Sequence, residues 1–183
     1  MVVLMRLYCF TFFYEQIKTE GYLSLAANKN PRQASVYARK ACSNDLEDIK
    51  AYLEKQFLGR TRSVCCLTEM PKIEKYKHPY LDHIVHHADI VSFELDDLIK
   101  AGLVEAIWCK DSHETAKINI DAENIYRLNS ADEIDLSPLP WHDADEKYGS
   151  PYNMLRHYFI VLTKGYIPSE YIRLERKGDK IEE

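Results

Sequence analysis

Residues 2–10, VVLMRLYCF, begin the stretch that decides the fold. They are rich in Val, Leu, Tyr and Phe, which is typical of a strand buried on both faces. Phe13 and Ile17 then fall four residues apart, as on one face of a helix, and Gly21 follows where a helix ends on a left-handed residue. Residues 22–25 predict a short return strand. The opening of the chain is therefore expected to form a strand, a helix and a second strand.

Two further helices are expected after this opening. The first covers residues 32–42 and follows a proline at a helix-start position. Asn44, with Glu47 three residues later, resembles a capping box at the start of the second helix. Four apolar residues recur at helical spacing in that second helix, and Gly59 is its expected end. These four residues are Leu46, Ile49, Leu53 and Phe57. The pair of helices is interpreted as scaffold.

The rest of the chain predicts short strands and helices in irregular order. The expected strands cover residues 63–68, 90–95, 104–109, 159–163 and 171–174, with two more between 117 and 128. Short helices are expected over residues 97–101 and from Ser150 to about His157, and a long acidic loop over 130–149. The order lacks a regular βαβ repeat and a glycine-rich phosphate loop. It therefore favours an α+β fold over a doubly wound sheet.

Length and charge restrict the class of protein. The chain has 183 residues, of which 46% are apolar and 29% charged, so it has the composition of a folded globular protein and not of a disordered one. We expect a single compact domain over residues 1–175 and a charged, frayed tail over 176–183. The net charge of −5 opposes non-specific coating of nucleic acid.

The cysteines and the N-terminal residues lead to an expectation about the cellular compartment of the protein. The five cysteines contain no C-x-x-C pair, so neither a zinc ribbon nor a disulfide framework is indicated, and a reduced, cytoplasmic protein is expected. The apolar run through Tyr14 has Arg6 as its only charge and no small-residue cleavage site after it. It is also too short to cross a bilayer. We interpret it as a buried strand that enters a helix, and expect no membrane partner.

Two clusters allow more than one interpretation. Four of the seven histidines fall within ten residues, namely His78, His83, His86 and His87. His83 and His87 would share a helix face, as metal ligands do, but H-E-x-x-H is absent and nearby lysines would repel a cation. We expect a surface segment without metal; a metal site is the alternative. Cys65 and Cys66 lie in an apolar strand, where a thiol is a small hydrophobe, and a nucleophile is the alternative.

Three stretches resemble motifs of ADP-ribosyltransferase-like proteins. Residues 7–11, LYCFT, with a helix and then EGYL at 20–23, look like the L-Y-H-x-T … I-L-x-x-G-L opening of that group. The group includes the DNA-targeting toxin DarT, the RNA 2′-phosphotransferases and the AbiGi-type abortive-infection proteins. Residues 64–71, VCCLTEMP, are similar to the V-C-F-T-E-I-P stretch of AbiGi-type proteins. Residues 165–172, GYIPSEYI, look like the V-P-P-E-Y-I close of the phosphotransferases.

The resemblance implies an ADP-ribosyltransferase-like fold with a mixed, split central sheet, and NAD as a substrate. Cleavage of the bond between nicotinamide and ribose passes through an oxocarbenium-like centre, which a carboxylate near the ribose stabilises. Two central strands grip the nicotinamide amide while an aromatic ring stacks on it. The cofactor-binding residues implied are Cys9, Thr11, Tyr14, Tyr37 and Thr68, and the catalytic carboxylates implied are Glu69 and Glu146.

Two departures from the family pattern leave a second function open. Cys9 replaces the usual histidine of the first motif and is a poorer donor to a ribose hydroxyl. The late glutamate has no counterpart in residues 156–160, RHYFI. The expected function is NAD-dependent ADP-ribosyl transfer to a protein or nucleic-acid acceptor, in a bacterial defence or toxin setting. The alternative is a non-catalytic binding or inhibitory module of the same fold that recognises a protein or nucleic acid.

Overall fold

The computed structural model describes residues 5–23, 45–56, 60–67, 69–70, 86–111, 114–119, 127–128 and 157–179. Its strands are β1 (Arg6–Thr11), β2 (Tyr22–Leu23), β3 (Ser63–Leu67), β4 (Asp89–Glu94), β5 (Val104–Asp111), β6 (Glu114–Asn119), β7 (Arg127–Leu128), β8 (His157–Thr163), β9 (Tyr166–Ile167) and β10 (Arg173–Arg176). Its α-helices are α1 (Tyr14–Glu20), α3 (Leu46–Gln56) and α5 (Leu95–Lys100). Single 3-10 turns are η2 (Arg60–Arg62) and η5 (Ser169–Tyr171).

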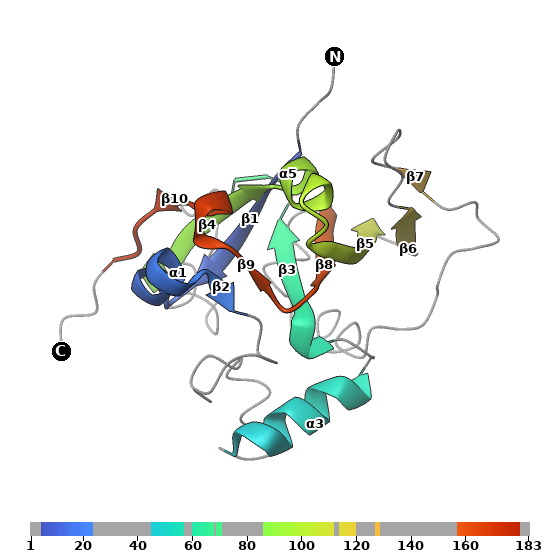
Figure 1. Ribbon diagram of the computed structural model, residues 1–183, viewed down its shortest axis with the longest axis horizontal. Coiled ribbons are helices and arrows are strands. Elements are labelled where there is room, and N and C mark those ends of the chain that lie inside the picture. The colour runs from blue at the N-terminus through green and yellow to red at the C-terminus, as the bar shows by residue number, and fades with distance from the viewer. Residues whose placement is uncertain are drawn as a thin grey trace.

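The main element is a sheet with the strand order β10-β4-β1-β3-β8-β5-β6-β7, and β2 pairs with β9 in a second, smaller sheet (Figure 1). The combination of helices with these sheets confirms the α+β class. Each pairing among the described strands is antiparallel, so the expectation of a mixed sheet is wrong for this part of the chain. Short connections, such as the one between β5 and β6, can join only antiparallel neighbours.

Two parts of the large sheet meet at β1. On one side β1 pairs with β4 over six positions, from Arg6 opposite Glu94 to Thr11 opposite Asp89. On the other side its register with β3 contains one pair, Tyr8 opposite Leu67, whereas β3 pairs with β8 over five positions. We call the facing edges of β1 and β3 the β1–β3 seam. The two strands approach each other at one point and diverge from it, as Figure 1 shows.

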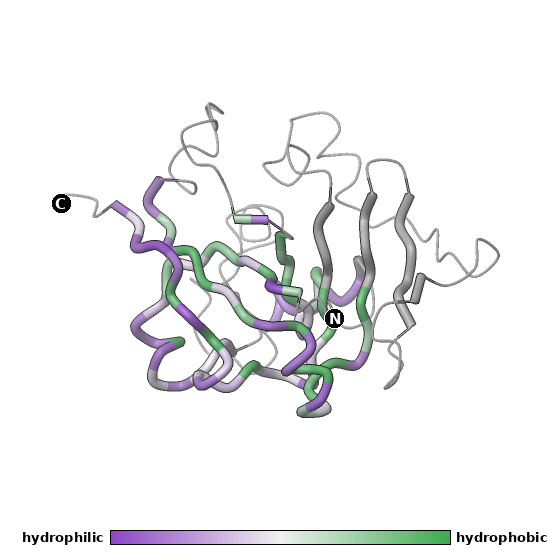
Figure 2. Tube along the Cα trace, turned by 90° about the horizontal axis from the view of Figure 1, so that it is seen from above, coloured by the Kyte–Doolittle hydropathy of each residue, from purple (hydrophilic) through white to green (hydrophobic). Residues whose placement is uncertain are grey.

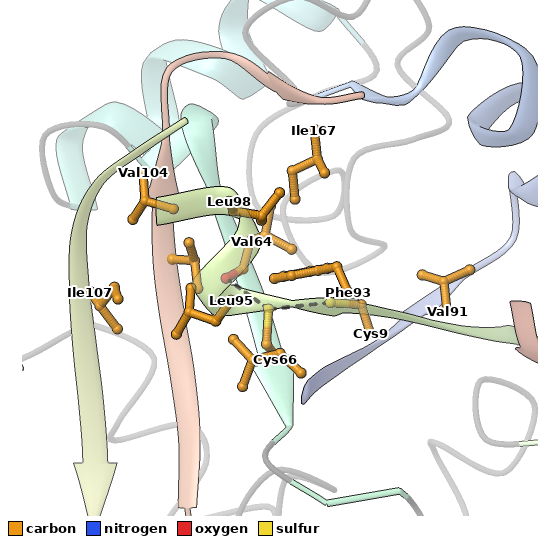
Figure 3. Packing of buried hydrophobic residues seen from close by; sticks show 12 residues of the cluster. Cys9, Val64, Cys66, Val91, Phe93, Leu95, Leu98, Val104, Ile107 and Ile167 are labelled. Atoms are coloured by element: carbon orange, nitrogen blue, oxygen red, sulfur yellow. Dashed lines mark hydrogen bonds between the residues drawn. The ribbon is translucent and has the colours of Figure 1, made fainter. Parts of the chain in front are cut away.

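The hydrophobic core lies against one face of this sheet (Figure 3). Along β1 the residues alternate, with Leu7, Cys9 and Thr11 buried and the positions between them partly exposed. The expectation of a first strand buried on both faces holds only in part: the second face of β1 is partly exposed, and its Tyr8 and Phe10 pack against Ile90. The strand that is buried along five of its six positions is β4. The core residues are Leu7, Cys9, Val64, Cys66, Val91, Phe93, Leu95, Leu98, Val104, Ile107, Val161 and Ile167.

Local signals in the sequence place most of the described helices. Gly21 ends α1 with φ 86°, as expected, and β2 follows it. The cap of α3 is Asp45 and not Asn44, because Asp45 Oδ1 accepts hydrogen bonds from the backbone N–H groups of Glu47 and Asp48, both at 3.0 Å. No described helix is long and apolar enough to cross a membrane.

Several expected elements lie outside the described residues or differ from them. The helix over 32–42, the end of α3 at Gly59 and the acidic loop over 130–149 are not among the described residues. Residues 150–156 of the helix expected from Ser150 to about His157 also lie outside the described residues, and His157 itself begins β8. The last strand begins two residues later than expected, at Arg173, since residues 169–171 form a 3-10 turn.

Gly21 carries the first testable prediction. Its φ of 86° and ψ of 172° are accessible almost only to glycine, and an added Cβ would lie 2.6 Å from the backbone oxygen of Ile167. We expect Gly21→Ala to lower the free energy of unfolding by about 3 kcal/mol, because strain and overlap add. Urea unfolding measures this loss.

Gly102→Ala is the matched control. Gly102 also has a positive φ, 70°, but nothing lies within 4 Å of its added Cβ. We expect a loss of about 1 kcal/mol there, from the left-handed backbone alone. Equal losses in the two variants would contradict the close approach of Gly21 to β9.

Candidate functional site

A group of polar side chains gathers where β1 ends and α1 begins. Thr11, the last residue of β1, stands opposite Asp89 of β4. The Thr11 hydroxyl accepts a hydrogen bond from the backbone N–H of Phe13 at 3.1 Å, and this bond supports the turn into α1. Asp89 is 8% exposed, so its carboxylate needs partners within the protein. Those partners come from the C-terminal segment.

Lys177 brings α1 and β4 together at this end of β1. Its ammonium nitrogen lies 3.3 Å from Asp89 Oδ2, 3.2 Å from Glu15 Oε1 and 5.2 Å from the centre of the Tyr14 ring. The hydrogen bond to Glu15, and then the one to Asp89, raise the pKa of Lys177. Since half of the Lys177 side chain is exposed, water screens these ion pairs. We call Tyr14, Glu15, Asp89 and Lys177 the Lys177 cluster.

The backbone that follows Lys177 is bound to the chain just before β4. The Gly178 N–H donates to Asp89 Oδ1 at 2.8 Å, and the Asp179 N–H donates to the His86 carbonyl at 2.9 Å. The His87 ring nitrogen Nδ1 lies 3.1 Å from the Asp179 carbonyl oxygen. A Cβ on Gly178 would overlap the backbone carbonyl of His87, so this close approach requires glycine.

These contacts differ from the expectation for the C-terminal tail. A frayed segment was expected from residue 176 onward, whereas the chain is bound as far as Asp179. Figure 2 shows the segment that leads to the C-terminus as mostly hydrophilic. A charged composition predicts a frayed segment, but here the buried carboxylate of Asp89 binds both the ammonium of Lys177 and the backbone N–H of Gly178. Polar contacts therefore keep the segment in place.

A second set of polar contacts fastens β10 to β4 and β1. The Arg6 guanidinium lies 2.6 Å from Glu94 Oε1 and 3.6 Å from Glu175 Oε1. The hydroxyl of Ser92, which is fully buried, donates to the same oxygen of Glu175. The hydrogen bond to Glu94 raises the pKa of Arg6. Because these side chains come from three adjacent strands, they hold the edge strand in register.

Cys9 lies in the core and not at a surface. Its side chain is 3% exposed, and its sulfur lies 3.2 Å from the sulfur of Cys66 on β3, as Figure 3 shows. Burial raises the pKa of the Cys66 thiol well above its ordinary value. Cys9, at the position where the resemblance implies a histidine, therefore contacts another thiol inside the protein.

Three of the other sequence-predicted residues, Thr11, Tyr14 and Glu69, lie at the two ends of β1. Thr11 and half-buried Tyr14 lie together at its C-terminal end, beside the Lys177 cluster. Glu69 is exposed and follows β3 by two residues. Because β3 is antiparallel to β1 with Leu67 opposite Tyr8, Glu69 lies toward the N-terminal end of β1, away from Thr11. Tyr37, Thr68 and Glu146 are outside the described residues.

His86 and His87 are the described members of the histidine cluster. His87 contacts the carbonyl of Asp179, so its ring helps to bind the C-terminal segment. Within the described ranges no group of three or more His, Cys, Asp or Glu side chains is arranged to hold a metal ion. His78 and His83 lie outside those ranges, and the metal alternative that involves them stays a prediction.

The sequence interpretation considered Asp89 only as a possible third ligand beside the histidines, and it missed the contacts of Asp89 with Lys177 and Gly178. One signal for Asp89 is its place directly before an apolar run, IVSF at 90–93, where an acid enters a buried strand. For Lys177 and Gly178 no local signal exists, because their partner in β4 is 88 and 89 residues away. Such a contact becomes visible only when the sheet topology is known.

Gly178 carries the second prediction. We expect Gly178→Ala to detach the segment after β10, because the added methyl group would overlap the His87 carbonyl. Trypsin should then cleave after Arg176 or Lys177 at least about tenfold faster than in the parent protein, since the cleaved backbone must first open. The rate is measured by mass spectrometry of the released peptide.

Asp179→Ala is the control for this experiment. It leaves the backbone N–H and carbonyl that contact residues 86 and 87, so its cleavage rate should match that of the parent. If Gly178→Ala is cleaved no faster than Asp179→Ala, the segment is not held by the contacts described above.

The chemistry available at this end of β1 follows from these side chains. Hydroxyl and carboxylate groups bind sugar hydroxyls, and an aromatic ring stacks on a planar base. These groups are supplied by Thr11, Asp89, Glu15 and Tyr14, and Lys177 neutralises both acids.

No protein-family model matches the chain, and neither the curated proteins nor the solved structures yield a match.

Proposed function

We propose that this chain is an ADP-ribosyltransferase-like domain that binds NAD and transfers ADP-ribose to a protein or nucleic-acid acceptor, in a bacterial defence or toxin setting. The observation that carries the proposal is the divergence of β1 from β3 around a single register pair. Backbone N–H and carbonyl groups need partners, and two strands that part from each other have such groups facing a common gap. The carboxamide of nicotinamide has one donor group and one acceptor, so it could hydrogen-bond to the backbone groups of both strand edges.

The C-terminal end of β1 supports a position for the nicotinamide. Tyr14 is half-buried there, and the Lys177 ammonium lies over its ring. The nicotinamide ring of NAD is also cationic, so it would be attracted to the same aromatic face. Thr11, three residues before Tyr14 along the chain, would offer a hydroxyl to the ribose. In this arrangement NAD and Lys177 compete for Tyr14, and nicotinamide binding moves the lysine aside.

A carboxylate has to stabilise the ribose cation that forms when nicotinamide leaves with the bonding electron pair. The resemblance assigns this role to Glu69 or Glu146. Asp89 and Glu15 are the described acids that contact Lys177 beside Thr11, and displacement of Lys177 would free both of them. The proposal therefore includes Asp89 as a third candidate, because it is buried and directly opposite Thr11.

One observation favours the non-catalytic module of the same fold as a second candidate function. At the position of the family's histidine, the Cys9 thiol faces Cys66 in the core. A thiol in that place cannot donate to a ribose hydroxyl at the surface. In this second candidate the domain keeps its fold and recognises a protein or nucleic acid without bond cleavage.

NAD binding is the third prediction. Millimolar NAD should raise the Tm of the domain, because a ligand of the folded state alone stabilises it by about 2.7 kcal/mol at a hundredfold excess over Kd. Tyr14→Leu should reduce this shift, since it removes the stacking ring. Tyr166→Leu is the control, because Tyr166 is an exposed tyrosine on β9, and it should keep the shift. A parent Tm unchanged by NAD would favour the non-catalytic module.

The catalytic acid is the fourth prediction. Glu69→Gln and Glu146→Gln are nearly isosteric, so a true catalytic carboxylate should lose at least about a hundredfold in nicotinamide release from NAD. The free energy of unfolding should change by less than about 0.5 kcal/mol. Nicotinamide release is followed by chromatography. Parental rates in both variants would exclude these two acids, and Asp89→Asn then tests the third candidate.

A further inference from the structure

We propose that Cys9 and Cys66 are a redox modification site, in which a peroxide oxidises the two thiols of the folded protein to a disulfide across the β1–β3 seam. The inference rests on the position of the two residues in adjacent strands, on the distance between their sulfurs, and on the sparse pairing around them. It does not depend on the proposed NAD chemistry.

The register brings the two cysteines directly opposite each other. Tyr8 faces Leu67 in an antiparallel pair, so the next positions along the strands, Cys9 and Cys66, also face each other. Because β1 and β3 diverge from this pair, the observation that bears on the bond is the distance of 3.2 Å between the two sulfurs.

The side chains need only a small movement. The two sulfurs lie 3.2 Å apart and point toward each other in the core (Figure 3). A disulfide bond is about 2.05 Å long, so the sulfurs must approach by roughly 1 Å. Because β1 and β3 share one register pair, few interstrand bonds resist this adjustment.

Cys65 is the neighbouring thiol that does not fit this role. Successive residues of a strand point to opposite faces, so Cys65 lies on the face of β3 away from Cys9. The burial pattern agrees, since Cys65 is partly exposed while Cys66 is fully buried. This difference makes Cys65 a control within the same strand.

The oxidation is balanced with one peroxide molecule. The sulfur of one cysteine attacks an oxygen of hydrogen peroxide, the O–O bond breaks, and a sulfenic acid and one water form. The second sulfur then attacks the sulfenic sulfur, the S–O bond breaks, and the leaving hydroxide takes the remaining thiol proton to form a second water. Two S–H bonds are lost, one S–S bond forms, and the peroxide accepts two electrons.

Burial determines which oxidants act and how fast. Both thiols are at most 3% exposed, so a small neutral oxidant such as hydrogen peroxide has better access than a bulky one. Burial also raises the pKa of Cys66, which keeps that thiol protonated and slows the reaction. The bond should therefore form slowly, as the seam opens locally, and should be reversed by dithiothreitol.

The experiment maps the disulfide in the folded, full-length chain. The reduced protein is treated with hydrogen peroxide, remaining thiols are blocked with N-ethylmaleimide, and a tryptic digest is analysed without reduction. We expect peptides 7–18 and 63–72 to be joined with the loss of two hydrogens. The same link should form in Cys65→Ala and be absent in Cys66→Ala. A link through Cys65, or a 9–66 link that forms only in urea, would overturn the proposal.

The Tm gives a second readout. A bond between residues 9 and 66 closes a long loop in the unfolded chain and should raise the Tm of the oxidised parent by at least about 5 °C. Cys65→Ala should show the same rise, and dithiothreitol should abolish it. If Cys66→Ala fails to fold, the parent and Cys65→Ala alone decide the outcome. An oxidised parent with no 9–66 link and no rise in Tm would overturn the proposal.

Discussion

The pairing of β1 with its two neighbours is the constraint on which the rest of this structure depends. β1 pairs with β4 along its whole length but meets β3 at one register position. A strand in the middle of a sheet normally completes its backbone hydrogen bonds on both sides. Here the second side is incomplete, and the large sheet consists of two well-paired parts joined at a narrow contact. The core residues behind that contact, Cys9 and Cys66 among them, keep the two parts together.

The structure also depends on how the outer edge of β4 is covered. An open strand edge is prone to pair with other chains, and β10 covers this one with a short, charged strand. Polar contacts fasten β10: the Ser92 hydroxyl donates to Glu175, and Arg6 of β1 lies 3.6 Å from the same carboxylate. Beyond β10, Asp89 accepts a hydrogen bond from the backbone N–H of Gly178. Most of the stabilising contacts at this edge are therefore polar, while apolar contacts dominate on the core side of the same strand.

A feature of the fold or of the site was predictable when it depends on residues close to each other in the sequence. Gly21, the helix from Leu46 and the strand at Ser63 follow from signals within a few residues, and each lies where the sequence placed it. The predicted cap, Asn44, is one residue away from the observed cap, Asp45. Both side chains are good acceptors, and only the backbone geometry decides between them. For the site, the strand predicted from the local pattern ended at Phe10, and only the resemblance put Thr11 on the first strand, of which it is the last residue.

The features that the sequence did not reveal share one cause, which is contact between residues distant in sequence. One-sided burial of β1 is set by the register with β4, and the bound C-terminal segment is set by Asp89. The position of Glu69 relative to Thr11 follows from the antiparallel direction of β3, which the residues of either strand do not encode alone. A charged segment such as residues 173–179 has the composition of a solvated end until its partners are known.

The covering of β4 by β10 also has a consequence for synthesis on the ribosome. Ser92 and its partner Glu175 are 83 residues apart, so β4 emerges from the exit tunnel long before the strand that protects it. At about 5–20 residues per second, the nascent chain leaves the outer edge of this largely apolar strand uncovered for several seconds. During that interval the early pairing of β4 with β1 leaves one edge free for a chaperone or for another nascent chain. The outer edge of β4 can therefore be covered only after residues 173–176 have been synthesised.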